Sequence, residues 1–280
     1  WDFRDPFVFA YLKEKVIGLI KQHGFGYLKI DYNDSLGIGC DGAESLGEGL
    51  RQQMLAVQDF FRLIKQEVPD LVIENCASGG HRLEPTMVGL TSMSSFSDAH
   101  ECEEIPIIAA NMHRVILPRQ SQIWAVLRKN DSLQRLVYSL ASTMLGRMCL
   151  SGDIHELNPE QWNKVDEAIS FYKLVSPIIK EGTTNRFGPR VPSYRHPRGW
   201  QGITRTSADG SQLMAVIHTF GGDNPELIRL PLPGAGHYQI KQVFSDGNAD
   251  VNVEGSELIC RLSQPFSAVC LLLTEKSDAE

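Results

Sequence analysis

Four carboxylates lie at the ends of predicted strands, where a parallel β/α fold collects its reacting groups. These residues are Asp31, Glu74, Asp98 and Asp153. In such a fold the carboxyl ends of the strands face one shared bowl. Two carboxylates in one bowl suit glycosidic bond cleavage, because one attacks or stabilises an oxocarbenium-like centre while the other moves a proton to the leaving oxygen. Each Asp taken alone could equally serve as a turn or helix cap.

Asp31 carries a second signal. Lys29 precedes it by two positions, so both side chains point to the same face of the predicted strand. A lysine that faces a barrel interior is costly unless it has a partner. We therefore expect Lys29 to be paired and to lie beside Asp31.

A glycine pair follows the next predicted strand. The segment 76–82 reads Cys-Ala-Ser-Gly-Gly-His-Arg. Paired glycines at a strand end let the backbone approach a ligand closely and expose N–H donors. A tight βα turn explains the same residues equally well.

The first element that must position these groups is a helix from Asp5-Pro6 to Gly24. An N-cap residue followed by proline is typical of a helix start. Val8, Leu12, Val16 and Leu19 are expected on one buried face.

Alternating strands and helices follow this first helix. Strands are expected at residues 27–31, 71–76, 93–96, 115–117 and 147–150. Helices are expected from Leu50 to before Pro69, from about residue 82, at 107–114, at 131–145, and from Asn158, where Gln161 is close to a capping box. Trp124 is expected on a loop or helix, as an aglycone platform or as core. This alternation predicts a parallel sheet with crossover helices.

The fold class that this order predicts is α/β, a partial (β/α)₈ barrel comprising about the last five strands. A closed barrel needs eight strands, so the missing ones would precede Trp1. An open doubly wound sheet is the alternative, but no glycine-rich phosphate loop follows any strand. We expect residues 1–182 to form the barrel part and residues 183–280, where turn residues separate short apolar runs, to form an antiparallel β-sandwich.

Composition excludes several partners. The chain has 280 residues and a formal net charge of −7, and its Lys and Arg residues are scattered, so nucleic acid is a poor candidate. No apolar run is long enough for a membrane span, which excludes a membrane as well. The six cysteines are far apart in the sequence, so we interpret them mostly as free thiols in a reducing compartment. This predicts a cytoplasmic protein.

The motifs together resemble glycoside hydrolase family 36, the bacterial α-galactosidases or melibiases. Residues 27–33 resemble the family's signature of lysine, tryptophan, aspartate, any residue and asparagine. Residues 74–82 resemble its cysteine and glycine-rich loop, Ser97-Asp98 its serine–aspartate motif, and residues 1–6 the segment one helix before the nucleophile strand. Order and spacing agree along essentially the whole chain.

This resemblance implies a retaining enzyme that removes terminal non-reducing α-D-galactosyl residues by double displacement, with no metal or organic cofactor. Asp31 would be the nucleophile and Asp98 the acid/base. Lys29 and Asn33 would bind galactose hydroxyls, and Cys76, Ser78, Gly79 and Gly80 would line the same subsite. Small α-galactosides such as melibiose or raffinose would be substrates, and the resemblance implies homo-oligomers.

The sequence departs from the family pattern at Ile30, which replaces tryptophan, at Ser78, which replaces a common glycine, and after Asp98, where the usual second aspartate is missing. The family's upstream acidic pair and arginine are not in this chain.

Transfer to a sugar acceptor stays open, as do the preferred aglycone and the oligomeric state. A truncated or degenerate barrel that only binds sugar is one alternative. A metal-dependent hydrolase drawing on His81, His100, His113 and Asp98 is another, although no HxH or HExxH spacing occurs.

Overall fold

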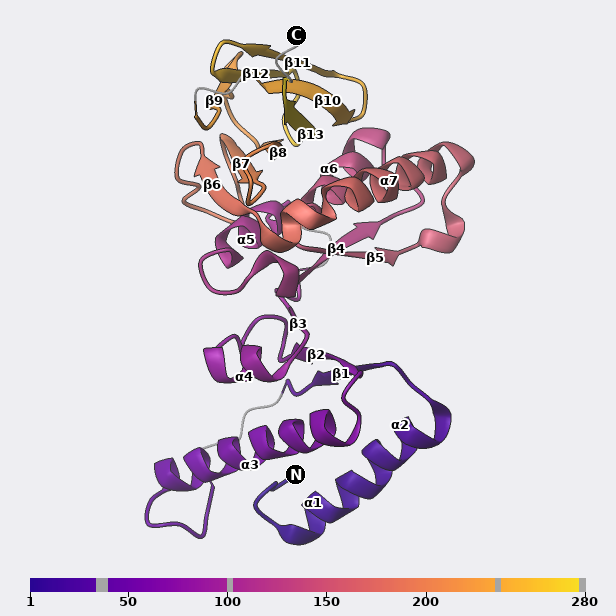
Figure 1. The fold of residues 1–280 in the computed structure, drawn as a ribbon, viewed down its shortest axis with the longest axis vertical. Helices are drawn as coiled ribbons and strands as arrows, with labels where there is room; N and C mark the ends of the chain where they lie inside the picture. The colour runs from indigo at the N-terminus through magenta and orange to yellow at the C-terminus, as the bar shows by residue number, and fades with distance from the viewer. Residues whose placement is uncertain (34–39, 100–102, 235–237, 277–280) are drawn as a thin grey trace. The chain divides into compact units, whose positions relative to one another are not determined.

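The computed structural model describes residues 1–33, 40–99, 103–234 and 238–276. The chain divides into two compact units, Trp1–Asp98 and Ala99–Glu280, which are described separately below (Figure 1). Within the described residues, no helix combines the length and the apolar character needed to cross a membrane.

Unit 1 alternates helices with three strands. Its helical segments are α1 (Pro6–Leu12), the π-helical turn η1 (Lys13–Ile17), α2 (Gly18–His23), α3 (Leu46–Glu67) and α4 (Pro85–Leu90). Its strands are β1 (Tyr27–Asp31), β2 (Val72–Cys76) and β3 (Met93–Ser95). The expected start at Asp5-Pro6 is confirmed, because the Asp5 side chain accepts a hydrogen bond from the Phe7 amide.

The buried stripe of the first helical segment differs from the prediction at one position. Leu19 is 50% exposed, whereas Ile20 is only 3% exposed. The π-helical turn Lys13–Ile17 lies just before these residues, and such a turn takes one residue more than an α-helical turn. It therefore shifts the inward position by one residue, from Leu19 to Ile20.

The strands of unit 1 are parallel, in the order β1, β2, β3. Leu28 and Ile30 of β1 pack against the apolar faces of the helices, in a cluster that includes Ile64, Ile73 and Phe61. Period-two alternation then turns Tyr27, Lys29 and Asp31 to the opposite face. One side of the sheet is thus the core, and the other carries the polar groups.

The first part of unit 2 continues the β/α pattern. Its helices are α5 (Ile105–Met112), η2 (Pro118–Gln120), α6 (Leu133–Thr143), η3 (Ile154–Glu156) and α7 (Pro159–Glu181), and its parallel strands are β4 (Ser121–Leu127) and β5 (Arg147–Gly152). The expected capping box at the start of α7 is confirmed, with Asn158 and Gln161 each bonding the other's backbone amide.

The prediction for the strand before α6 was wrong. Residues 115–117 form no strand, and Val115 and Leu117 are 60% and 48% exposed. The strand is β4, which runs from Ser121 to Leu127, so Trp124 lies on a strand rather than on a loop or helix. Its indole N–H donates to Gln122 Oε1 at 3.0 Å.

The second part of unit 2 is a sandwich of two antiparallel sheets (Figure 1). One sheet has the order β10 (Tyr238–Phe244), β13 (Ala268–Glu275), β8 (Gln212–Thr219), β7 (Trp200–Thr206) and β6 (Thr183–Phe187). The other has β11 (Ala249–Glu254), β12 (Glu257–Leu262) and β9 (Ile228–Pro231). A common core holds them together, since Ile217 and Leu271 of the first sheet and Leu230, Leu258 and Cys260 of the second belong to one buried cluster.

The predicted fold class is confirmed: successive β/α units of a partial (β/α)₈ barrel are followed by an antiparallel β-sandwich. Helix α7 ends at Glu181 and β6 begins at Thr183, close to the expected change from barrel to sandwich. The domain boundary between residues 182 and 183 stays a prediction.

Candidate active site

Asp31 ends β1 on the polar face of the sheet in unit 1. Its backbone is in register with that of Cys76 at the end of β2, and its side chain is exposed. Residues from both faces of β1 line a cavity of about 660 Å³, among them Lys29, Asp31 and Ile30. Residues of the first helical segment and of α3 line it as well, so the cavity is bounded by β1 and these helices.

Lys29 is paired, as the sequence predicts, and its partner is Glu74. The Lys29 ammonium lies 3.5 Å from Glu74 Oε1, and the Glu74 side chain is only 3% exposed. The Glu74 carboxylate also accepts hydrogen bonds from Ser95 Oγ at 2.5 Å and from the Tyr27 hydroxyl. These donors make up for the loss of water around a buried carboxylate.

The charge of Glu74 also acts on the protonation of Lys29. Burial lowers the pKa of Lys29, but the Glu74 carboxylate, with smaller contributions from Cys76 and Asp31, outweighs it, so the pKa lies above its usual value. Lys29 therefore stays a cation, held by the buried carboxylate of Glu74.

Asn33 ties the end of β1 to the glycine-containing loop after β2. Its side-chain Oδ1 accepts a hydrogen bond from the Ser78 amide at 2.6 Å. Ser78 has a φ of 44°, in the left-handed region that a non-glycine residue rarely adopts. The bond from Asn33 helps to hold this unfavourable backbone, so the two motifs are joined directly.

The far end of the same loop is fixed on the helix side of the sheet. The Arg82 guanidinium lies 4.1 Å from the centre of the Tyr32 ring, and the Tyr32 hydroxyl donates to Asn75 Oδ1 at 2.9 Å. Asn75 Nδ2 in turn donates to the Arg82 carbonyl at 2.6 Å. Burial raises the pKa of Tyr32 to about 12, which keeps its hydroxyl proton available for this bond.

The two glycines bring the loop against the Ser97-Asp98 motif. A Cβ atom on Gly79 would lie 2.4 Å from the Ser97 carbonyl carbon and 2.5 Å from the Asp98 amide nitrogen. A Cβ atom on Gly80 would lie 2.4 Å from the Phe96 carbonyl oxygen. Glycine is therefore required at both positions for the backbones to approach, and the three predicted motifs meet in unit 1.

We expect Gly79→Ala to destabilise unit 1 by about 1–3 kcal/mol and to lower activity, because the φ of 78° is unfavourable for alanine and the new methyl group would displace Asp98. Urea unfolding and steady-state kinetics would measure the two effects. Gly42→Ala is the matched control, since Gly42 has a φ of 81° but nothing within 4 Å of a Cβ. Equal losses in both variants would exclude the close approach as the cause.

Cys76 is buried beside these groups. Burial raises the pKa of its thiol, although a hydrogen bond with Ser95 works in the opposite direction. The thiol is therefore protonated at neutral pH and acts as a small, weakly polar wall residue. Cys76 and the other described cysteines, Cys40, Cys149, Cys260 and Cys270, form no disulfide.

Other candidates have structural partners. The Asp153 carboxylate lies 3.1 Å from the Arg128 guanidinium. The His113 ring donates from Nε2 to the Leu145 carbonyl at 2.6 Å and lies 3.3 Å from the Thr184 hydroxyl, and burial lowers its pKa to about 4. His81 is exposed, and His100 lies outside the described residues. In the part of the chain that the structure describes, no group of three or more His, Cys, Asp or Glu residues could hold a metal ion.

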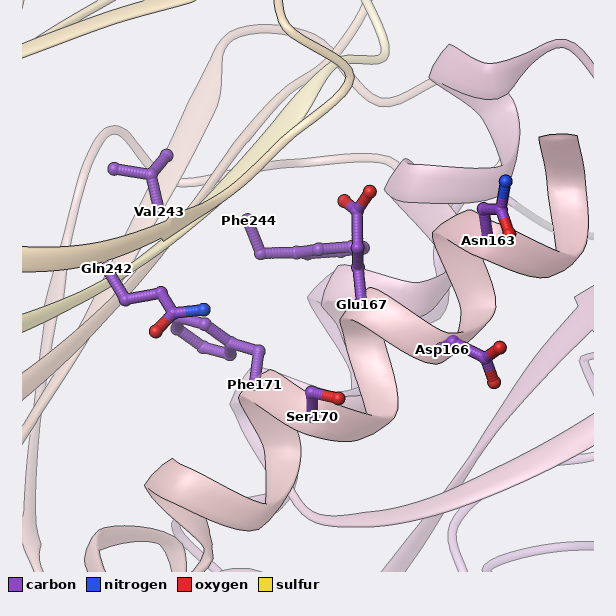
Figure 2. Close-up of a pocket in the computed structure, with 8 residues that line it drawn as sticks. All are labelled: Asn163, Asp166, Glu167, Ser170, Phe171, Gln242, Val243 and Phe244. Carbon is purple, nitrogen blue, oxygen red and sulfur yellow. The ribbon is translucent and has the colours of Figure 1, made fainter.

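A groove of about 550 Å³ lies between α7 and β10 in unit 2. Figure 2 shows its residues, and Asp166 points away from β10. The lining residues are Asn163, Asp166, Glu167, Ser170, Phe171, Gln242, Val243 and Phe244. Phe171 and Phe244 are 1% and 2% exposed, and their ring centres lie 6.3 Å apart. These rings pack the helix onto the sandwich and offer no open face to a sugar.

Three residues of the site escaped the sequence reasoning: Tyr27 and Ser95, which bond to Glu74, and Arg82 as the cation over Tyr32. Tyr27 shares its strand face with Lys29 and could have been found by alternation. Ser95 lies two strands away from Lys29, and nothing in its local sequence predicts that contact.

Comparison with known proteins places the chain in a family. The model of the melibiase family matches residues 1–182. Alpha-galactosidase 2 of Pediococcus pentosaceus is 25% identical over 212 residues, which is 72% of this chain and 28% of that protein. The chain belongs to the melibiase family.

Solved structures show the same fold. The alpha-galactosidase AgaA of Geobacillus stearothermophilus, of glycoside hydrolase family 36, matches with a TM-score of 0.81 and 20% identity, over 98% of this chain and 39% of that one. The alpha-galactosidase of Lactobacillus brevis matches with a TM-score of 0.79 and 19% identity, over 100% of this chain and 39% of that one. The chain thus spans well under half the length of these relatives.

Proposed function

We propose that this chain carries the catalytic carboxylates of a retaining α-galactosidase, with Asp31 as nucleophile and Asp98 as acid/base. The observation that supports this most is the meeting of three segments. Asn33, two residues after Asp31, bonds to Ser78, and Gly79 next to it lies against the backbone of Asp98. Two carboxylates carried by neighbouring segments can act on one glycosidic bond.

The reaction has two balanced steps. Asp31 attacks the anomeric carbon while the bond to the leaving oxygen breaks and Asp98 gives that oxygen its proton. Water then attacks the same carbon, Asp98 takes a proton from it, and the bond to Asp31 breaks. Two inversions at one carbon retain the α configuration. A sugar hydroxyl in place of water would give transfer.

Lys29 and Asn33 would hold galactose hydroxyls, with Cys76, Ser78, Gly79 and Gly80 forming the wall of the same subsite. The substrate class proposed is small α-galactosides. Variants of the Geobacillus enzyme have been solved with raffinose and with stachyose, which supports that class. The cytoplasmic location and homo-oligomers stay predictions.

The test is release of p-nitrophenol from p-nitrophenyl α-galactoside by the 280-residue chain and by a longer protein extended upstream. A closed (β/α)₈ barrel needs eight strands and the described residues supply five, β1 to β5, so we expect turnover in the longer protein. Proton NMR of the first sugar released would show the α anomer. If neither folded protein turns over, the chain is a sugar-binding or degenerate barrel and the proposal is wrong.

Glu74→Gln is expected to raise KM for galactosides about tenfold with a smaller change in kcat, because the amide no longer holds the Lys29 ammonium by charge. The amide oxygen can still accept from one of the two hydroxyls, of Ser95 and Tyr27, and the other hydroxyl oxygen can accept from the amide nitrogen, which limits the structural damage. Steady-state kinetics measures the split.

The matched control for Glu74→Gln is Asp59→Asn. It neutralises the exposed ion pair of Asp59 and Arg62 on α3 and should leave KM unchanged. An unchanged KM in Glu74→Gln, with a lower melting temperature, would mean that Glu74 serves only the fold.

A further inference from the structure

The basic residues are scattered along most of the chain, but one stretch is a local exception. Residues 182–208 contain five arginines and no Asp or Glu, in a chain whose net charge is −7. The arginines are Arg186, Arg190, Arg195, Arg198 and Arg205. Arg205 is used internally, because its guanidinium donates to the carbonyls of Ile178, at 3.1 Å, and Ile179, at 3.0 Å. The remaining positive charge needs another explanation.

Two of these arginines open into a cavity of unit 2, of about 760 Å³. Helix α5 and the turn after it, strand β6 and the loop after β6 supply its walls. The lining residues are Ile107, Asn111, Arg114, Arg186, Arg190, Val191, Pro192 and Tyr194. Three guanidinium groups thus share one cavity, and none of the described residues that line it is an acid.

Arg186 is the most constrained of the three. Its Nε is buried, and within the described residues no acceptor takes its hydrogen. Leaving a buried donor unpaired is costly. Burial, and to a lesser degree the charge of Arg114, lowers the pKa of Arg186. Two like charges held close without an acid are unfavourable in the folded protein, and an anion would relieve that repulsion.

Tyr194 adds a donor to the same cavity. Its hydroxyl oxygen accepts a hydrogen bond from Asn111 Nδ2 at 2.9 Å. The hydroxyl hydrogen can therefore be directed at a further acceptor. The groups that meet here are nearly all donors, which is complementary to a ligand that only accepts.

We propose that this cavity binds a small oxyanion of the phosphate class, held by the guanidinium groups of Arg114 and Arg186, with Arg190 and Tyr194 at the rim. Planar guanidinium groups bind such oxygens in bidentate fashion. The same chemistry would hold free phosphate or the phosphate group of a phosphorylated sugar. The site lies in unit 2 and does not depend on the function proposed for Asp31 and Asp98.

The test is calorimetric titration of the full chain with inorganic phosphate and, separately, with a hexose 6-phosphate, at ionic strength held constant with chloride. We expect one saturable site for phosphate, weakened at least about tenfold in Arg186→Gln and in Arg114→Gln. Tighter binding of the hexose phosphate would assign the site to the ester. The matched control is Arg229→Gln, which removes an arginine paired with Glu257 on the sandwich and should leave binding unchanged.

Thermal melting is a second measurement, which still tests the proposal if one of the arginine variants is unstable. Phosphate should raise the melting temperature of the unchanged chain, because a ligand that binds only the folded state stabilises it. Without phosphate, Arg186→Gln should melt no lower than the unchanged chain, since it removes repulsion. Absence of a saturable site, or binding equal in both variants and the unchanged chain, would overturn the proposal.

Discussion

Asp31→Ala is expected to lower kcat/KM for p-nitrophenyl α-galactoside at least about 10³-fold, because it removes the carboxylate proposed to form the covalent intermediate. This corresponds to a loss of about 4 kcal/mol of transition-state stabilisation. The variant should fold normally, since Asp31 is exposed and lies outside the buried core. Kinetics and melting are measured in whichever form of the protein turns over.

Azide distinguishes a lost nucleophile from a disturbed site. In Asp31→Ala it should attack the substrate directly and restore turnover, with β-galactosyl azide as the product, because only one inversion then occurs. Asp70→Ala, at an exposed turn between α3 and β2, is the control and should keep full activity. Substantial activity in Asp31→Ala without azide would reject the assignment.

Asp98→Ala is expected to have an effect that depends on the leaving group. For raffinose, kcat/KM should fall about 10³-fold, because the leaving sugar oxygen needs a proton. For p-nitrophenyl α-galactoside the rate of the first step should fall less, since p-nitrophenolate can leave without receiving a proton. Parallel kinetics on the two substrates measures this difference.

In Asp98→Ala, azide should give the other anomer of galactosyl azide. With Asp31 intact, azide intercepts the covalent intermediate and should yield α-galactosyl azide, the opposite anomer to that from Asp31→Ala. Equal losses on both substrates would contradict a general-acid role for Asp98. The pair of variants therefore separates the two carboxylates by product stereochemistry.

Local patterns predicted most elements well. Pro6 after a capping Asp5, the alternation around Lys29, and the capping box at Asn158 are features of neighbouring residues, and each forms as expected. The failures have two different causes, one within a helix and one between strands. A π-helical turn shifted the buried stripe to Ile20, and residues 121–127 became a strand through pairing with β5.

The candidate site shows the same division. Spacing alone indicated that Lys29 needs a partner and that Gly79 and Gly80 allow a close approach. The partner of Lys29 is Glu74, and the close neighbour of Gly79 is the Ser97-Asp98 backbone. Both lie far along the chain from the residues they contact. The roles of Asp31 and Asp98 in the reaction stay predictions.

By itself the sequence determined the order of β/α elements, the change to β structure near residue 183, and the residue types at strand ends, because caps, periodicity and glycine conformations act over a few neighbours. The tertiary structure alone decided that Glu74 is a buried support and that Arg114 and Arg186 share a cavity. These facts depend on which strands and helices become neighbours in space. That is settled by packing of the whole unit, which no local stretch encodes.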